Sequence, residues 1–365
     1  MVSLAVTLAA VVVALVVLDL AFKFVYREPE SADEPADERH TVETEDGLEL
    51  ELWRHLPEGD VSEAEPVFLL HGLGTTHRSL NFDDDVGLAQ YLAEHGYDCW
   101  LLDLRGRYGS DAPGGWLPFK PWSFDDYYEY DVPAALDYVL DETGADDVHW
   151  VGHSMGGMLY YAVAGTGGRD DDVRSAVTLG SPIVIEHGRV LSALSLLGVT
   201  FSWMLSRLKR LHFLPALGRV LSVFYPVLPK GLVAVLFNKP NTETNVTRRA
   251  STECVSRMTP MLLDDFARWI TYGDWDSRDG EVDYAAGVEE IETPTLVVAG
   301  AYDHLVPFPD VESAYYALEG AEEREFYEAG TAQGFEHEYA HADLVFGRNV
   351  REELYPDVAD WLDEH

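Results

Sequence analysis

The chain has 365 residues, of which 47% are hydrophobic and 12% aromatic, enough for a packed core in one large domain or two smaller ones. This composition excludes a wholly disordered or fibrous protein. With 65 Asp and Glu against 25 Lys and Arg, the formal charge is −40, which repels phosphate groups and argues against nucleic-acid binding.

Many carboxylates, few lysines and a normal apolar content resemble proteins of salt-loving organisms such as haloarchaea, where concentrated salt screens self-repulsion. The two cysteines, Cys99 and Cys254, are too few for a disulfide framework in a chain of this size. Cys99 lies in an apolar run, so we expect it to be buried. No Cys or His cluster has metal-ligand spacing, and we expect neither a metal ion nor an organic cofactor.

The N-terminus predicts a membrane anchor. Residues 2–18 read VSLAVTLAAVVVALVVL, and the apolar run continues past Asp19 to Phe22. About 20 apolar residues match the hydrocarbon thickness of a bilayer, so we predict a transmembrane helix within residues 1–24. A cleaved signal peptide is the alternative, but no Lys or Arg precedes the apolar run. Lys23 and Arg27 follow it, which favours a single-pass protein of the cell membrane with its C-terminal domain in the cytoplasm.

An acidic segment follows the anchor. Residues 28–46 carry nine Asp or Glu, one Arg and two prolines, without a long apolar stretch. We predict a solvated linker over residues 25–46 and a folded domain that begins at Gly47.

From Gly47 onward, short β-rich runs alternate with helical patterns, which is typical of an α/β fold with a mostly parallel sheet flanked by helices. The predicted strands cover residues 49–56, 66–70, 97–102, 147–151, 175–179, 294–299 and 323–327. The predicted helices include residues 86–95, 124–141 and 155–164.

A G-x-S-x-G motif stands at Gly152-His153-Ser154-Met155-Gly156, directly between a predicted strand and a predicted helix. In that context the motif predicts a nucleophile elbow, a sharp turn that exposes the serine above the sheet, with Gly152 and Gly156 leaving room for close packing. Ser154 is therefore the candidate nucleophile.

A serine nucleophile needs a base and an acid that orients the base. Asp303 follows the predicted strand 294–299, where open parallel sheets place their sites, and is the candidate acid. His337 and His341 both follow the last predicted strand, and His341, which precedes an apolar helix start, is the preferred base. The chain order Ser154, Asp303, His341 is the order expected of a strand–turn–helix scaffold of this kind. His304 is expected to serve in packing or solvent contact.

The negative charge that develops on an attacked carbonyl needs preorganised donors. The backbone N–H of Met155, directly after the nucleophile, is one candidate, and the N–H of Leu73, in the loop after strand 66–70, is the other. His71 is expected to pack beneath that loop without transferring protons.

These motifs resemble the α/β-hydrolase superfamily over residues 47–365, apart from one insertion. The resemblance rests on HGLG at 71–74, DLRG at 103–106, GHSMGG at 152–157, AGAYDHLVP at 299–307 and YAHAD at 339–343. The pattern Tyr339-x-His341-x-Asp343 resembles the acid-lipase branch, whose members hydrolyse neutral-lipid esters, and this implies His341 as the base. The elbow also resembles that of polyhydroxyalkanoate synthases, which carry cysteine there, so Ser154 favours hydrolysis.

The insertion lies between strands 175–179 and 294–299, and in this fold such a segment normally forms a cap. We predict a helical cap over residues 183–290, between two parts of the core at 47–182 and 291–365. Residues 187–242 contain no Asp or Glu but seven basic residues, Arg189, Arg207, Lys209, Arg210, Arg219, Lys230 and Lys239.

This apolar, basic segment favours a cap that rests on an anionic membrane surface. An internally packed cap that lines an apolar pocket is the alternative. A second transmembrane helix at 190–206 is conceivable, but an odd number of crossings there would separate Ser154 from Asp303 and His341.

Together these features predict a membrane-anchored serine hydrolase that cleaves carboxylic esters, of lipid or acyl type, through an acyl-enzyme intermediate. The expected partners are an ester or lipid substrate and the membrane, without nucleic acid. An acyltransferase or a thioesterase with the same triad and a non-catalytic membrane scaffold are the alternatives.

Overall fold

The computed structural model describes residues 36–59, 61–82, 86–107, 109–113, 121–188, 222–228 and 230–365. The predicted membrane anchor lies outside these residues, as do five of the seven basic residues of the 187–242 segment. Within the described ranges, no helix combines the length and apolar character that a membrane crossing needs. The anchor therefore stays a prediction from the sequence.

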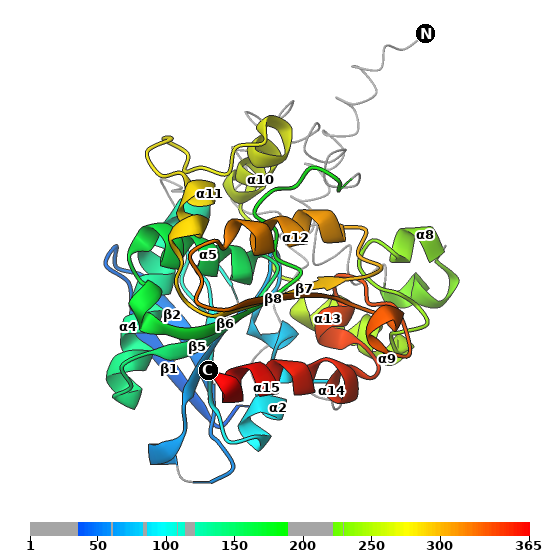
Figure 1. Ribbon diagram of the computed structural model, residues 1–365, viewed down its shortest axis with the longest axis horizontal. Helices are drawn as coiled ribbons and strands as arrows, with labels where there is room; N and C mark the ends of the chain where they lie inside the picture. The colour runs from blue at the N-terminus through cyan, green and yellow to red at the C-terminus, as the bar shows by residue number, and fades with distance from the viewer. Residues whose placement is uncertain are drawn as a thin grey trace.

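A twisted sheet of eight strands forms the centre of the described part (Figure 1). In chain order the strands are β1 (Glu38–Glu43), β2 (Glu49–His55), β3 (Pro66–Leu70), β4 (Asp98–Asp103), β5 (Val148–His153), β6 (Val173–Leu179), β7 (Thr295–Gly300) and β8 (Arg324–Ala329). Their spatial order is β1-β2-β4-β3-β5-β6-β7-β8. The β1–β2 and β2–β4 pairs are antiparallel and the other five pairs are parallel, which confirms the predicted mostly parallel α/β sheet.

All seven predicted strands form within two residues of their expected bounds. Burial explains why these strands could be predicted. Every residue of β3, β4, β5 and β7 is buried. Central strands of a parallel sheet are covered on both faces and therefore read as short apolar runs.

The predicted start of the folded domain at Gly47 is wrong, because β1 lies inside the segment expected to be a linker. All six residues of β1 pair with β2, from Glu38 opposite Arg54 to Glu43 opposite Glu49. Alternate β1 side chains are half-buried, and His40 lies against the Trp100 ring with a centroid distance of 4.9 Å. An edge strand can carry many charges on its exposed face, so its acidic composition concealed it.

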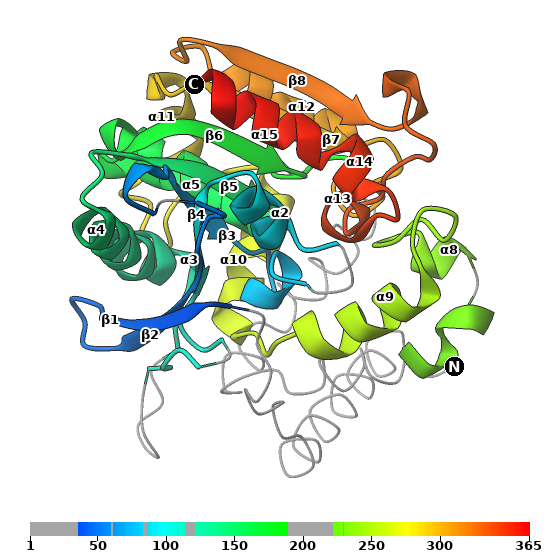
Figure 2. The ribbon, with the colours of Figure 1, turned by 90° about the horizontal axis from the view of Figure 1, so that it is seen from below.

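Helices cover both faces of the sheet. They are α2 (Leu88–Glu94), α3 (Phe124–Asp126), α4 (Val132–Thr143), α5 (Met155–Gly167), α12 (Phe308–Ala317), α13 (Asp343–Phe346), α14 (Val350–Glu353) and α15 (Tyr355–Glu364), and a π-helical turn, Tyr127–Asp131, joins α3 to α4. One hydrophobic cluster takes residues from α4, α5 and α12, and a second takes residues from α2 and α15. Figure 2 shows α2 and α15 on the near side of the strands.

The segment between β6 and β7 contributes α8 (Lys230–Val233), α9 (Thr244–Arg249), a π-helical turn (Ala250–Cys254), α10 (Pro260–Tyr272) and α11 (Tyr284–Gly287). In Figure 1, α10 and α11 lie above the sheet, and α8 and α9 lie beside α13. These elements lie within the segment predicted to be a helical cap.

Local signals define α10, the longest of these cap helices. Its first turn is capped by the Thr259 hydroxyl, which accepts from the Met261 N–H, and Gly273 ends it with φ 79°. Its buried residues include Leu262, Phe266 and Trp269, spaced by three or four positions so that they share one face.

Candidate functional site

Ser154 stands on a strained turn between β5 and α5. It has φ 54° and ψ −117°, and it is the one non-glycine residue with a positive φ among the described residues. Such backbone conformations cost about 1–3 kcal/mol and persist where the surroundings enforce them. The turn is held by a 2.8 Å hydrogen bond from the Ser154 N–H to the Leu179 carbonyl. Ser154 itself remains half-buried rather than enclosed.

Glycine is required on both sides of this turn because main chains meet there. A Cβ on Gly152 would lie 2.5 Å from the Gly156 carbonyl carbon, and one on Gly156 would lie 2.0 Å from the Leu70 carbonyl oxygen. Both distances are too short for any side chain. Gly152 and Gly156 therefore allow the first turn of α5 to pack against β5 and the end of β3, as the motif predicts.

His341 and Asp303 form a hydrogen-bonded pair. The His341 Nδ1–H donates to Asp303 Oδ2 at 2.7 Å, and both residues are buried. Asp303 Oδ1 accepts from the N–H groups of Leu305 and Val306, each at 2.8 Å. Because these two bonds fix the carboxylate, it can hold the imidazole in the tautomer that carries its proton on Nδ1 and leaves Nε2 free to accept.

The His341 ring and the Ser154 backbone both lie near the end of β6. Ser154 bonds to Leu179, and the next residue, Gly180, touches the ring, since a Cβ on Gly180 would lie 3.2 Å from His341 Nδ1. Gly180 has φ 63°, which glycine adopts without strain. The three candidate residues therefore gather beyond the carboxyl ends of β5, β7 and β8.

The two other histidines weighed for this region lie apart from the pair. His337 lies 3.8 Å from Glu336 at the surface. His304 is exposed and packs its ring on Tyr302 at a centroid distance of 4.5 Å. Asp303 accepts from His341 and not from either of them.

The backbone N–H groups of Leu73 and Met155 are the predicted oxyanion donors. Met155 is the first residue of α5, and the Gly72–Leu73 turn covers Ser154, since a Cβ on Gly72 would lie 3.1 Å from the Ser154 Cβ. No hydrogen bond in the described part of the chain engages the N–H of Leu73 or of Met155. Both donors are thus available, although their role stays a prediction.

Two further buried histidines support the site. Because each ring binds a backbone carbonyl, neither is assigned a proton transfer. His71 donates through Nδ1 to the Gly72 carbonyl at 2.9 Å, and burial lowers its pKa to about 4. His153 donates through Nε2 to the His341 carbonyl at 3.1 Å, and burial lowers its pKa to about 3. His71 packs beneath the loop as predicted, whereas the contact of His153 with His341 was not foreseen.

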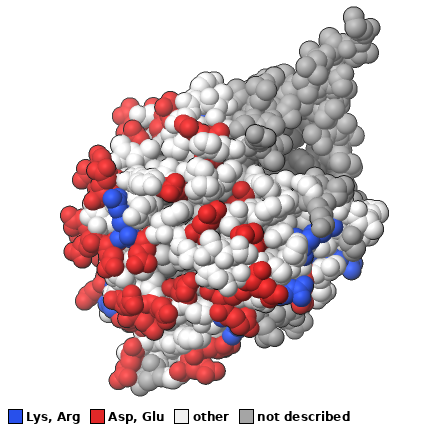
Figure 3. All heavy atoms as spheres, turned by 45° about the vertical axis from the view of Figure 1, so that its right-hand side comes forward, with Lys and Arg blue, Asp and Glu red and all other residues white. Residues whose placement is uncertain are grey.

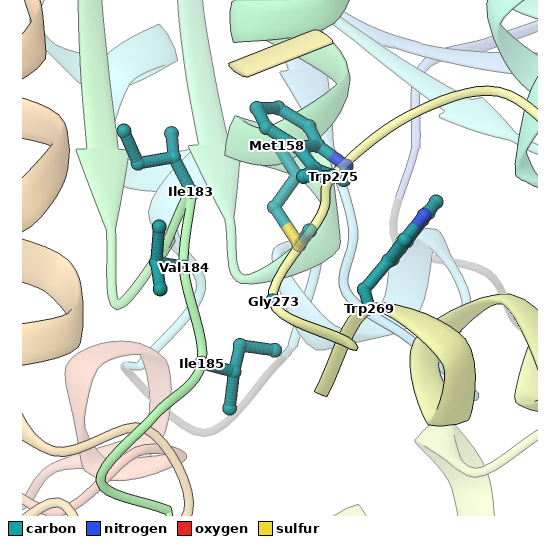
Figure 4. A pocket seen from close by; sticks show the side chains of 7 residues that line it. All are labelled: Met158, Ile183, Val184, Ile185, Trp269, Gly273 and Trp275. Atoms are coloured by element: carbon teal, nitrogen blue, oxygen red, sulfur yellow. The ribbon is translucent and has the colours of Figure 1, made fainter. Parts of the chain in front are cut away.

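An apolar pocket opens beside the elbow (Figure 4). Met158, whose N–H donates to the Ser154 carbonyl, lies on one side, and Ile183 to Ile185, just after Gly180, lie on the other. Trp269 and Trp275 of the cap complete the lining, together with Gly273. The sequence offered no signal that these cap and core residues line one pocket, because they lie about 100 positions apart.

Groups that could hold a metal ion were sought over the same described residues. No set of three or more His, Cys, Asp or Glu there has a suitable arrangement.

Comparison with known proteins agrees with this architecture. The profile of the alpha/beta hydrolase fold family matches residues 65–337, so the chain belongs to that family. It is 26% identical over 358 residues to triacylglycerol lipase 2 of Arabidopsis thaliana, covering 89% of this chain and 84% of the relative.

Two further similarities are more limited. Gastric triacylglycerol lipase of Bos taurus is 34% identical over 143 residues, which cover 35% of this chain and 35% of the lipase. A solved esterase from Exiguobacterium antarcticum superposes with a TM-score of 0.56 at 16% identity, covering 88% of this chain and 98% of the esterase. The similarity to the esterase supports the fold alone.

The buried His71 should make the folded protein less stable at acid pH. The ordinary pKa of a histidine is 6.5, and that of His71 in the fold is about 4. Between these pH values the unfolded chain binds a proton that the folded chain does not. The unfolding free energy therefore falls as the pH falls. We expect this group to remove about 2 kcal/mol of unfolding free energy between pH 7 and pH 5. Urea unfolding at both pH values should show a smaller loss in His71→Gln, and an equal loss would contradict the assignment.

Proposed function

We propose that this protein is a serine hydrolase that cleaves carboxylic esters through an acyl-enzyme intermediate. The observation that carries the proposal is the buried His341–Asp303 pair beside the strained turn that presents Ser154. The lipases named above support a carboxylic ester hydrolase as the class of enzyme.

The geometry supports a two-step reaction. His341 Nε2 takes the proton of the Ser154 hydroxyl as its oxygen attacks the ester carbonyl carbon, and the tetrahedral intermediate forms. His341 then gives this proton to the leaving alkoxide as the C–O bond breaks, which leaves an ester of Ser154. Asp303 holds the ring and stabilises its charged form. A water molecule, deprotonated by His341, attacks the acyl-enzyme, and the proton returns to Ser154 when the acid leaves.

The oxyanion of both intermediates would accept from the N–H groups of Leu73 and Met155. The Met155 N–H belongs to the first turn of α5, whose partial positive charge favours an anion there. Donors that are already in place cost no reorganisation during the reaction, and one such donor is typically worth about 3–4 kcal/mol.

A lipid or acyl ester is the substrate class that we propose. The pocket between Met158, Ile185 and Trp275 is lined by apolar and aromatic side chains and begins one helical turn from Ser154. Such a lining suits the apolar end of an acyl chain. Two of the relatives are named triacylglycerol lipases, which agrees with this substrate class.

We further propose that the protein acts at the cytoplasmic face of the cell membrane, held by the N-terminal helix and contacted by the cap. Among the residues that the structure describes, four of the nine exposed large hydrophobic side chains belong to the cap segment around α8, namely Val223, Phe224, Val227 and Leu236. This segment lacks acidic residues, although the chain carries −40. Figure 3 shows Asp and Glu over much of the left and lower surface, with several Lys and Arg atoms toward the right edge.

The Ser154→Ala variant tests the catalytic proposal. We expect ester turnover to fall by about 10⁴-fold or more, because the substitution removes the nucleophilic hydroxyl. The chain should still fold, because the backbone is unchanged. Turnover of p-nitrophenyl esters from acetate to palmitate, measured at high salt, should also rise with chain length in the wild type. Ser313→Ala, at a partly buried serine of α12, is the matched control.

Three outcomes would redirect this proposal. Full activity in Ser154→Ala would exclude Ser154 as the nucleophile. Faster turnover of acyl thioesters than of matched esters, or acyl transfer to an added alcohol in place of hydrolysis, would identify a thioesterase or an acyltransferase with the same triad.

Vesicle binding tests the membrane contact of the cap. In a chain that begins at residue 36, so that β1 is kept, we expect Val223→Ser, Phe224→Ser and Val227→Ser together to weaken binding to phosphatidylglycerol-containing vesicles about tenfold or more, because three exposed apolar side chains are lost. Tyr316→Ser, which removes an exposed aromatic side chain from α12, should leave binding unchanged. Equal binding by all variants would favour the internally packed cap.

A further inference from the structure

Asp343 is a buried carboxylate that the mechanism above does not use. It lies two residues after His341 at the start of α13, and its side chain is fully buried. No Lys, Arg or His nitrogen of the described residues lies within 4 Å of it, and burial raises its pKa to about 6. A buried anion without a counter-charge is costly unless hydrogen-bond donors converge on it, so its partners indicate why it is there.

One set of partners closes the loop that carries His341. Asp343 Oδ2 accepts from the Ala340 N–H at 3.0 Å, and the Asp343 N–H donates to the Ala340 carbonyl at 3.0 Å. His341 lies between these two residues in the chain. The carboxylate and the backbone of Asp343 therefore fix the short turn from which the imidazole projects.

The other set of partners comes from the cap, about 100 residues earlier in the chain. Asp343 Oδ1 accepts from the Thr242 hydroxyl at 2.8 Å, and Oδ2 accepts from the Asn238 N–H at 3.0 Å. A backbone bond of 2.8 Å from the Ala342 N–H to the Leu236 carbonyl runs beside them. Every group that binds the carboxylate is a hydrogen-bond donor. A carboxylate, which only accepts, satisfies these donors, whereas the NH₂ group of an amide does not.

We propose that Asp343 is a positioning residue that couples the cap segment 236–242 to the His341 turn, so that the docked cap sets the catalytic base in place. The inference rests on the proposed function. Its physical basis is that a small displacement of a general base costs much of the rate, whereas a cap that only binds substrate would affect KM.

The Thr242 hydroxyl offers the cleanest test, because Thr242→Val removes one cap donor at nearly constant volume. With p-nitrophenyl acetate, a small ester, we expect kcat to fall roughly tenfold and KM to change less than twofold. Thr242→Ser keeps the hydroxyl and should stay close to the wild type. Thr331→Val, which removes the hydroxyl of the exposed Thr331 that bonds to Glu338, is the matched control and should leave kcat unchanged.

Asp343→Asn tests the carboxylate itself, because the amide must aim its NH₂ group at other donors. We expect kcat to fall roughly 10²-fold, and the rate of Ser154 labelling by a fluorophosphonate to fall with it. In the Asp343→Asn/Thr242→Val double variant the two effects should not multiply, because both break the same contact.

The outcomes separate this inference from the proposed function. If Ser154→Ala abolishes hydrolysis but Thr242→Val lowers only the thermal midpoint or raises only KM, the coupling is refuted and the hydrolase stands. Independent, multiplying effects of the two substitutions would also refute the coupling. If Ser154→Ala retains hydrolysis, the proposed function itself fails.

Discussion

The structure depends on how closely main chains approach one another around Ser154. Strand β5 must turn into α5 within one residue, and the turn is possible because Gly152, Gly156 and Gly157 place no Cβ between the helix, the strand and their neighbours. The energetic cost is the left-handed backbone of Ser154 itself, which the bond to Leu179 helps to hold. This packing sets Ser154 at the junction of β5 and α5, directly beyond the carboxyl end of β5.

The turn that carries the candidate base is held from three sides. The His153 ring donates to the His341 carbonyl from beneath, Asp303 orients the imidazole, and Asp343 ties the turn to the cap. The first two contacts belong to the core and the third does not. In this arrangement the cap is part of what holds the base in place, in addition to being a wall of the apolar pocket.

The sequence predicted the central sheet well for a physical reason. Strands such as β3 are fully buried apolar runs bounded by turns, and their pattern does not depend on distant residues. The elbow and the Asp303 position follow from the same logic, because they are defined by where a strand ends. His341 was favoured by the residues that follow it and by its family pattern.

What the sequence could not predict depends on distant partners. β1 is an acidic edge strand whose only signal is a weak alternation, and it forms because β2 pairs with it. The ring contact of His153 with His341 and the bonds of Asp343 to Asn238 and Thr242 join segments more than 100 residues apart. Hydrogen-bond partners of this kind become visible only when the topology is known.

The central claim is that His341 makes the Ser154 hydroxyl reactive. The most direct measurement is the rate of covalent labelling by a fluorophosphonate, with the modified peptide identified by mass spectrometry in the wild type, His341→Gln and His337→Gln. We expect one adduct on Ser154 in the wild type, an unchanged rate in His337→Gln and a rate lower by about 10³-fold or more in His341→Gln. Rapid labelling of Ser154 in His341→Gln, or an adduct on another residue, would contradict that claim.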